Sequence, residues 1–285
     1  MTSVRAAPLP LLPGLLLGGA ATLLRRKAVA WPEIAFAAHF AVAGIDMAHV
    51  ARYRKLFDNP GTDVPLTYFY LLAQRAQLAL MLDERFPCPL PGLIHSRNDL
   101  RQHAVAQTDS ALDIHVAVRL YLDVGDVPKI ACGVDIEQAG RLVVSCTSEY
   151  RMSRKKRNWP AVQAEPEKLP ISFSQIDWTF EKQVIRRYAI VSGDYNPIHL
   201  SSLLARLFGF RSAIAHGMYS VGRAAAQIER QTSRPVTAIS ADFRRPIHLP
   251  AQAIFGLESL GADQGNYGVL LADQQKLALS GGWET

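Results

Sequence analysis

A long apolar helix followed by several strands is expected twice along this chain, and that order constrains the fold more than any other sequence feature. The first helix is expected over residues 68–84, which read YFYLLAQRAQLALMLDE and are apolar nearly all round. A helix of that kind is usually buried, here inside a curved sheet. The second is expected over residues 217–231, where apolar side chains recur at helical spacing. Each half of the chain therefore has its own central helix.

Strand signals follow both helices. Residues 112–122 alternate strictly between apolar and other side chains, which is typical of a half-buried strand. After a turn at Gly125-Asp126 the alternation resumes over residues 130–136, and after a turn at Gly140 it continues over residues 142–146. The second half has weaker strand candidates at residues 241–247, 253–257, 269–272 and 277–280. A helix followed by strands predicts an α+β fold with antiparallel pairing rather than alternating β–α units.

The two halves also share a weak repeat. Residues 93–95 (LIH) follow the first helix, and residues 246–248 (PIH) follow the second at nearly the same distance. Between the halves, residues 151–170 are rich in charge and proline, which indicates a linker. We therefore predict an N-terminal unit over residues 1–150 and a C-terminal unit over residues 171–285.

Charge and cysteine usage narrow the class of function. The net charge of +6 attracts polyanions, and its densest clusters lie at residues 25–27 and 151–157. No nucleic-acid recognition motif accompanies them, so no nucleic-acid partner is predicted. Cys88, Cys132 and Cys146 form no CxxC pair, which argues against a structural zinc site. We expect buried, reduced thiols in a cytoplasmic protein.

The apolar N-terminal segment has two interpretations. Residues 9–24 read LPLLPGLLLGGAATLL, which is too short to span a membrane but resembles the core of a signal peptide. Arg25, Arg26 and Lys27 follow immediately, where a small-residue cleavage site would be expected. We therefore expect an apolar leader that packs on the folded body, without stable membrane insertion.

Residues 192–199 read SGDYNPIH and carry side chains suited to acid–base chemistry. Ser192, Gly193 and Asn196 favour turns, so Asp194 is expected on a loop and His199 where a helix begins. Both side chains could then enter one cavity and share a water, with one removing a proton and the other delivering it. In the alternative, Asp194 or Asn196 merely caps a helix and His199 is half-exposed.

Residues 215–218 (AHGM) stand where the second central helix begins. A glycine there, Gly217, leaves backbone N–H groups exposed and lets a ligand approach closely. The positive end of the helix dipole suits a carbonyl oxygen that gains negative charge during a reaction. His216 could equally be a packed structural histidine, and His95 is expected to be structural.

Several motifs follow one another in the second half of the chain. The string SGDYNPIH is followed by an amphipathic helix, then by GFRSAIAHGM at residues 209–218, and then by FRRPIHLP at residues 243–250. This arrangement resembles the MaoC-like family of (R)-specific enoyl-thioester hydratases and 3-hydroxyacyl-thioester dehydratases. Residues 65–98 of the first half resemble the amino-terminal unit of the two-unit members. The resemblance implies a double hot-dog fold, in which an antiparallel sheet wraps around each long central helix.

The resemblance also implies roles for individual residues. Asp194 and His199 match the catalytic pair that activates water, Asn196 matches the residue that orients the pair, and the Gly217 amide matches the donor to the thioester carbonyl. Further support residues are Ser192, Gly193 and His216. The implied reaction is reversible addition of water to a trans-2-enoyl thioester, which yields an (R)-3-hydroxyacyl thioester without a metal or cofactor.

Two departures from the family pattern bear on the site. Ser201 stands where many members carry an acidic residue. The first half lacks the SGDxNPxH string, and residues 58–60 (DNP) are not followed by a suitably placed histidine. We therefore expect one active site, in the second half, with the first unit shaping room for the acyl chain.

The expected substrate partner is an acyl-CoA or acyl-carrier-protein thioester. Arg244 and Arg245 are candidates for its phosphate groups. A monomer or a homodimer of the two-unit chain is expected. Alternative functions are a hot-dog acyl thioesterase and a non-catalytic acyl-thioester-binding module.

Overall fold

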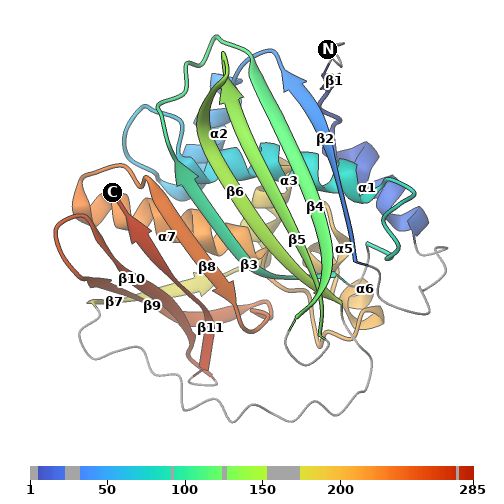
Figure 1. Ribbon diagram of the computed structural model, residues 1–285. Coiled ribbons are helices and arrows are strands. Elements are labelled where there is room, and N and C mark those ends of the chain that lie inside the picture. The colour runs from blue at the N-terminus through green and yellow to red at the C-terminus, as the bar shows by residue number, and fades with distance from the viewer. Residues whose placement is uncertain (1–5, 23–32, 91–92, 124–126, 153–173, 274–275) are drawn as a thin grey trace.

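One eleven-stranded sheet runs through the computed structural model, which describes residues 6–22, 33–90, 93–123, 127–152, 174–273 and 276–285 (Figure 1). The strand order is β1-β2-β4-β5-β6-β3-β8-β11-β10-β9-β7, and every pairing except β1 with β2 is antiparallel. The strands are β1 (Ala7–Pro8), β2 (Ile34–Val42), β3 (Leu93–Gln102), β4 (Leu112–Asp123), β5 (Val127–Gln138), β6 (Arg141–Met152), β7 (Ser174–Phe180), β8 (Ala238–Phe243), β9 (Ala251–Ser259), β10 (Gln264–Leu271) and β11 (Lys276–Glu284). The helices are α1 (Leu12–Ala21), α2 (Met47–Phe57), α3 (Phe69–Met81), α4 (Lys182–Ser192), α5 (Pro197–Leu200), α6 (Ser202–Leu207) and α7 (Gly217–Thr232).

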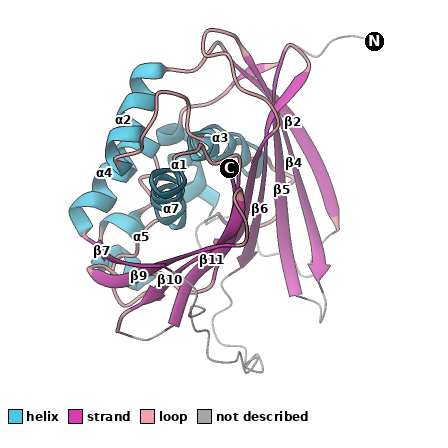
Figure 2. Ribbon diagram, turned by 90° about the vertical axis from the view of Figure 1, so that its left-hand side faces the viewer, coloured by secondary structure: helices cyan, strands magenta, loops and turns pink. Residues whose placement is uncertain are grey.

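The two predicted central helices are α3 and α7, and both lie on the inner side of the bent sheet (Figure 2). Most side chains of α3 are buried because the helix is apolar on nearly all sides, as its sequence predicts. It begins after a 3₁₀ turn at Leu66–Tyr68 and ends at Met81, three residues before the predicted end. The α+β prediction is confirmed, and the architecture is a double hot dog.

The strand predictions for the first half are confirmed in β4, β5 and β6, and Gly140 forms the predicted turn with a positive φ of 75°. Gly125-Asp126 lies outside the described residues. In the second half, β8 covers residues 238–243 instead of the predicted 241–247. The regular ladder ends there because the N–H groups of Arg244 and Arg245 both bond to Ala278 O, and Pro246 beyond them has no N–H to continue it. Residues 93–95 begin β3, whereas residues 246–248 lie beyond the end of β8, so the two similar segments have different secondary structure.

The segment after the SGDYNPIH string differs from the prediction of one amphipathic helix. Ser201 is extended, with φ −134° and ψ 120°, and separates α5 from α6. Its Oγ accepts a hydrogen bond from Leu204 N–H at 3.3 Å and so caps α6. The apolar face of α6 points to solvent, because Leu203 and Leu207 are each 70% exposed.

The apolar N-terminal segment packs on the body, as predicted, within its described part. β1 pairs with β2, Leu9 and Leu15 are buried, and the Arg75 guanidinium on α3 donates to the carbonyl oxygens of Leu9 and Pro10, each at 2.8 Å. In the described part of the chain, no helix has the length and apolarity needed to cross a membrane. All three cysteines are buried and stand outside any disulfide, in agreement with the prediction of buried thiols.

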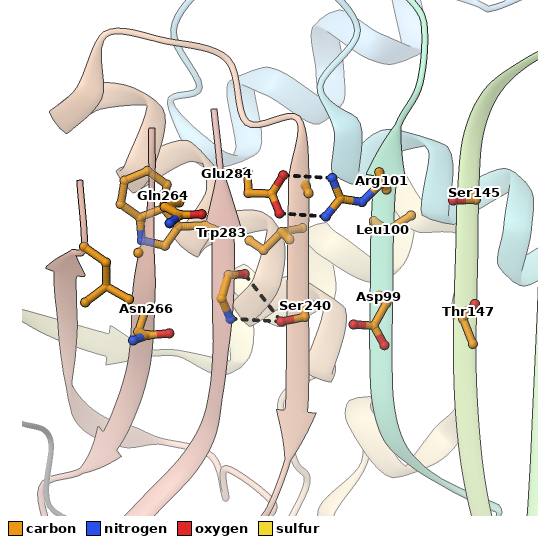
Figure 3. Close-up of a pocket in the computed structure, with 15 residues that line it drawn as sticks. Asp99, Leu100, Arg101, Ser145, Thr147, Ser240, Gln264, Asn266, Trp283 and Glu284 are labelled. Carbon is orange, nitrogen blue, oxygen red and sulfur yellow. Dashed lines mark hydrogen bonds and ion pairs between the residues drawn. The ribbon is translucent and has the colours of Figure 1, made fainter. Parts of the chain in front are cut away.

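The two units share one sheet and one core. β3 pairs with β8, and the Arg101 guanidinium donates to both carboxylate oxygens of Glu284, at 2.8 and 2.6 Å, on the outer face of this seam (Figure 3). A hollow of about 450 Å³ also lies on the seam, and no predicted site residue lines it. On the inner side, α2 packs on α7, with the Phe57 and Tyr219 ring centroids 5.5 Å apart. The proposed unit boundaries stay a prediction: β6 includes Arg151 and Met152, and residues 153–170 lie outside the described residues.

Candidate active site

The loop after α4 is held by a chain of short-range hydrogen bonds. Gly193 ends α4 in the left-handed conformation, with φ 75°, and its N–H bonds to Ala189 O at 2.8 Å. Asp194 N–H then donates to Ser192 Oγ, and Asn196 N–H donates to Asp194 Oδ1, each at 3.2 Å. These bonds direct the Asp194 carboxylate away from the helix it follows and back toward the protein interior.

Asn196 is a helix cap, as the alternative interpretation of this loop allowed. Its Oδ1 accepts from Ile198 N–H at 3.3 Å, and Pro197 takes the first position of α5. The same residue holds Asp194 through its backbone N–H. Capping and support of the carboxylate are therefore compatible, and the short helix α5 carries His199 back toward Asp194.

The two predicted histidines meet beside Asp194. The His199 and His216 rings are stacked, with centroids 3.7 Å apart. His199 Nδ1 lies 2.9 Å from Ile214 O, and His216 Nε2 lies 3.0 Å from Asp194 O. Carbonyl oxygens only accept, so each of these nitrogens carries its proton. His199 Nε2 is then the unprotonated nitrogen of a neutral ring, and it is available as a base.

His216 is a packed histidine as well as a site residue. It is buried, and its ring lies 4.9 Å from the Tyr188 ring. Among the described residues, one group has the spacing to hold a metal ion. It consists of Asp194, His199 and His216, which each offer one ligand atom within 4.8 Å of the other two. The bonds of His199 Nδ1 and His216 Nε2 to carbonyl oxygens occupy one nitrogen of each ring.

A residue of the N-terminal unit completes this cluster. Gln74 lies on α3, and its Nε2 donates to Asp194 Oδ2 at 2.9 Å across 120 residues of sequence. The sequence interpretation missed it. The available signal was that Gln74 is one of few polar side chains in a mostly apolar helix, because an amide that faces the interior needs a polar partner.

His95 of the N-terminal unit also lies at this boundary. Its ring stacks on Tyr150 at 4.8 Å and contacts Phe243 of β8 at 4.9 Å. Burial lowers the pKa of His95 to about 4. The ring is therefore neutral and packed between the two units, as a structural histidine would be.

Gly217 begins α7, and His216 is its N-cap residue. A Cβ placed on Gly217 would lie 2.7 Å from Phe243 Cε1, so the position has room for glycine only. The first amides of a helix have no partner within the helix. The Phe243 ring packs against Gly217 where a side chain would otherwise stand, and the first N–H groups of α7 have no partner within the helix.

Arg244 and Arg245 follow directly after Phe243. Arg244 is exposed, whereas the Arg245 guanidinium donates to Leu277 O at 2.8 Å. Their backbone N–H groups both reach Ala278 O, at 2.8 and 3.1 Å. Arg244 is therefore the more exposed of the pair, and a phosphate-binding role for either stays a prediction.

The surroundings of Asp194, His199 and His216 shift the pKa values of all three groups. Burial alone would raise the pKa of Asp194, but the imidazoles of His216 and His199 and the hydrogen bonds from Gln74 and Asn196 outweigh it and lower that pKa. Burial lowers the pKa of His199, and burial together with His199 lowers the pKa of His216 to about 3. Near neutral pH the cluster therefore holds one carboxylate and two neutral imidazoles.

The chain is a double hot dog with an Asp–His loop beside a helix N-terminus, and it belongs to the MaoC-like dehydratase family. The model of the MaoC-like domain matches residues 160–269. A 3-hydroxyacyl-thioester dehydratase X from Mycobacterium tuberculosis is 34% identical over 216 residues, which is 73% of this chain and 75% of that protein. Family membership makes the chain an enzyme of the hydro-lyase class, with dehydratase or hydratase activity.

Solved structures agree with this assignment. A crystal structure of HtdX from M. tuberculosis has a TM-score of 0.70 and 25% identity, and the match covers 86% of this chain and 98% of that one. A second M. tuberculosis protein, described as a double hotdog fold, has a TM-score of 0.53 and 13% identity over 90% of this chain and 96% of its own. This second likeness concerns the fold alone.

Proposed function

We propose that this enzyme reversibly adds water to a trans-2-enoyl thioester and forms an (R)-3-hydroxyacyl thioester, with Asp194 and His199 as the catalytic pair. The observation that carries the proposal is the convergence of an ionised Asp194 carboxylate and a neutral His199 whose Nε2 has an available lone pair. The relative named as a 3-hydroxyacyl-thioester dehydratase supports the substrate class.

In the hydration direction, Asp194 and His199 hold one water against C3 of the enoyl group. A base of the pair takes a proton from the water as the C3–O bond forms, and the proton is delivered to C2 as the C2–C3 double bond is lost. The pair then returns to its starting state, and no net proton is gained or released. A well-placed acid–base pair of this kind accelerates a reaction by about 10²–10⁴-fold.

During this step, negative charge develops on the thioester oxygen. The Gly217 N–H at the start of α7 is the donor that we assign to this oxygen, supported by its place at a helix N-terminus and by the absence of a side chain there. A preorganised donor at such an oxygen contributes ~3 kcal/mol to transition-state stabilisation. Ser192 and Gly193 shape the loop, His216 Nε2 donates to the Asp194 carbonyl oxygen, and Asn196 N–H donates to the Asp194 carboxylate.

The pH dependence of kcat/KM is expected to show a plateau that continues below pH 6.5, the ordinary pKa of histidine. The reason is that activity requires ionised Asp194 and neutral His199, and both pKa values are lowered in the folded protein. Both groups therefore take up protons only at more acidic pH. Initial rates in a constant-ionic-strength buffer series from pH 4 to 9 check this, and an acid limb centred at or above pH 6.5 would contradict it.

The remaining parts of the proposal concern partners and location. The substrate is carried as an acyl-CoA or acyl-carrier-protein thioester, with Arg244 and Arg245 near its phosphates. We infer a cytoplasmic enzyme, in agreement with three buried cysteines that form no disulfide, and a monomer or homodimer. The N-terminal unit supplies the rest of the core and room for the acyl chain.

The test incubates the purified protein with crotonyl-CoA and with a longer trans-2-enoyl-CoA. We expect loss of the conjugated double bond without release of free thiol. We also expect that only an (R)-specific 3-hydroxyacyl dehydrogenase oxidises the product. Release of free thiol would instead indicate the thioesterase alternative. Binding without turnover of either CoA ester or of the carrier-protein ester would indicate the binding module.

A further inference from the structure

We propose that Gln74, on the central helix of the N-terminal unit, is a positioning residue that holds the catalytic Asp194 carboxylate; this inference rests on the proposed function. Gln74 Nε2 donates to Asp194 Oδ2 at 2.9 Å. The unit without a catalytic pair of its own therefore contributes a polar contact to the site of the other unit.

Each oxygen of the Asp194 carboxylate is held by a different unit. Oδ1 accepts from Asn196 N–H at 3.2 Å, within the catalytic loop, and Oδ2 accepts from Gln74 on α3. A carboxylate held at one oxygen can rotate about its Cβ–Cγ bond, whereas donors at both oxygens fix its plane. Gln74 is therefore the group that decides how Asp194 faces the reacting water.

The α3 helix is a rigid base for this contact. The side chains of Ala73 and Ala76 on either side of Gln74 are completely buried, and the neighbouring Arg75 is tied to the carbonyl oxygens of Leu9 and Pro10. Sites on packed helices hold their side chains more precisely than sites on loops. The catalytic loop thus rests against a fixed amide.

The second heteroatom of the Gln74 amide has no partner of its own. An ionised carboxylate only accepts, so the NH₂ group must face Asp194 and Oε1 must face elsewhere. Oε1 is buried and has no hydrogen-bond partner among the described residues. A buried acceptor of this kind needs a donor. The O–H of a water beside Asp194, or of the 3-hydroxyl product, has the matching chemistry.

The test compares Gln74→Leu with Gln77→Met. Gln77 lies one turn further along α3, is buried, and bonds to Ser148 and Tyr150 instead of Asp194, so it is a matched control. Gln74→Leu is expected to lower kcat by about 10- to 100-fold, because hydrogen bonds to charged groups are the strong ones. KM is expected to stay within about threefold, and the acid limb of kcat should move to higher pH because a donor that lowers the pKa of Asp194 is gone.

The control variant should lower the melting temperature without moving the acid limb. The other ionisable groups whose charges act on or with Asp194 are unchanged in both variants: His199, His216, His95, Tyr70 and Tyr188. Wild-type kcat and acid limb in Gln74→Leu would overturn the proposal. So would an equal shift of the acid limb in Gln77→Met, because the effect would then be structural.

A third variant, Gln74→Glu, reverses the expected pH dependence. Two carboxylates at this distance repel, so one keeps its proton to higher pH. The activity is expected to be low at pH 8 and to rise toward pH 5.5, where the shared proton turns Glu at this position into a donor. Activity that falls monotonically with acid, as in the wild type, would overturn the donor role.

One readout does not depend on turnover. The titration of the Asp194 carboxyl carbon, followed by ¹³C NMR in wild type and in Gln74→Leu, should show a midpoint at higher pH in the variant. If the wild type turns over no enoyl thioester, the proposed function fails, yet this midpoint still decides the role of Gln74. An unchanged midpoint would overturn it.

Discussion

Replacing Asp194 with asparagine is expected to lower kcat for enoyl-thioester hydration by about 10³-fold while the protein stays folded. Asparagine preserves the size of the side chain and one oxygen that accepts, but it removes the negative charge. The loss of charge removes the group that holds and polarises the water together with His199 Nε2. Steady-state hydration rates and a thermal melt of the same preparation measure the two properties separately.

Three further variants make this result interpretable. Asp242→Asn removes a carboxylate that pairs with Arg97 at 3.1 Å and forms no hydrogen bond or ion pair with Asp194 or His199, so this variant should retain full activity. His199→Ala should cost about as much as Asp194→Asn, and the double variant little more, since groups that act as a unit are not additive. Full activity in Asp194→Asn would exclude the proposed catalytic pair.

Adding a methyl group at Gly217 is the second change with a large expected effect. In Gly217→Ala the new Cβ would lie 2.7, 3.0 and 3.1 Å from Cε1, Cδ1 and Cζ of Phe243. Either the ring or the first turn of α7 must move, and the N–H assigned to the thioester oxygen moves with it. We expect kcat to fall by about 10²-fold, the cost of losing one preorganised donor.

A rescue variant separates displacement from other effects. Gly217→Ala combined with Phe243→Leu provides space beside the methyl group and should recover a large part of kcat. Gly222→Ala is the control on the same helix: its Cβ would lie 2.8 Å from Phe57 Cζ, so the variant should melt earlier but keep its kcat at 20 °C. Wild-type kcat in Gly217→Ala would contradict the assignment of its N–H.

The periodicity of the sequence predicted those helices and strands whose pattern of buried side chains follows from neighbouring residues alone. Residues 112–122 form β4 because alternating side chains suit a sheet with one buried face, and residues 69–81 form α3 because a helix apolar on all sides is stable only inside the protein. The predictions failed where single residues interrupt a pattern. Ser201 divides the predicted helix into α5 and α6, and the chain leaves β8 before Pro246.

The parts of the site that are formed by neighbouring residues could be predicted from the sequence. The contacts between residues distant in the sequence could not. By itself, the order of residues in SGDYNPIH and AHGM determined a turn, a helix start and a second helix start, because capping and turn conformations depend on neighbouring residues. Only the tertiary structure decided that His199 stacks on His216 and that Gln74 meets Asp194. These contacts join segments 17 and 120 residues apart, and only the packing of both units on one sheet brings such segments together.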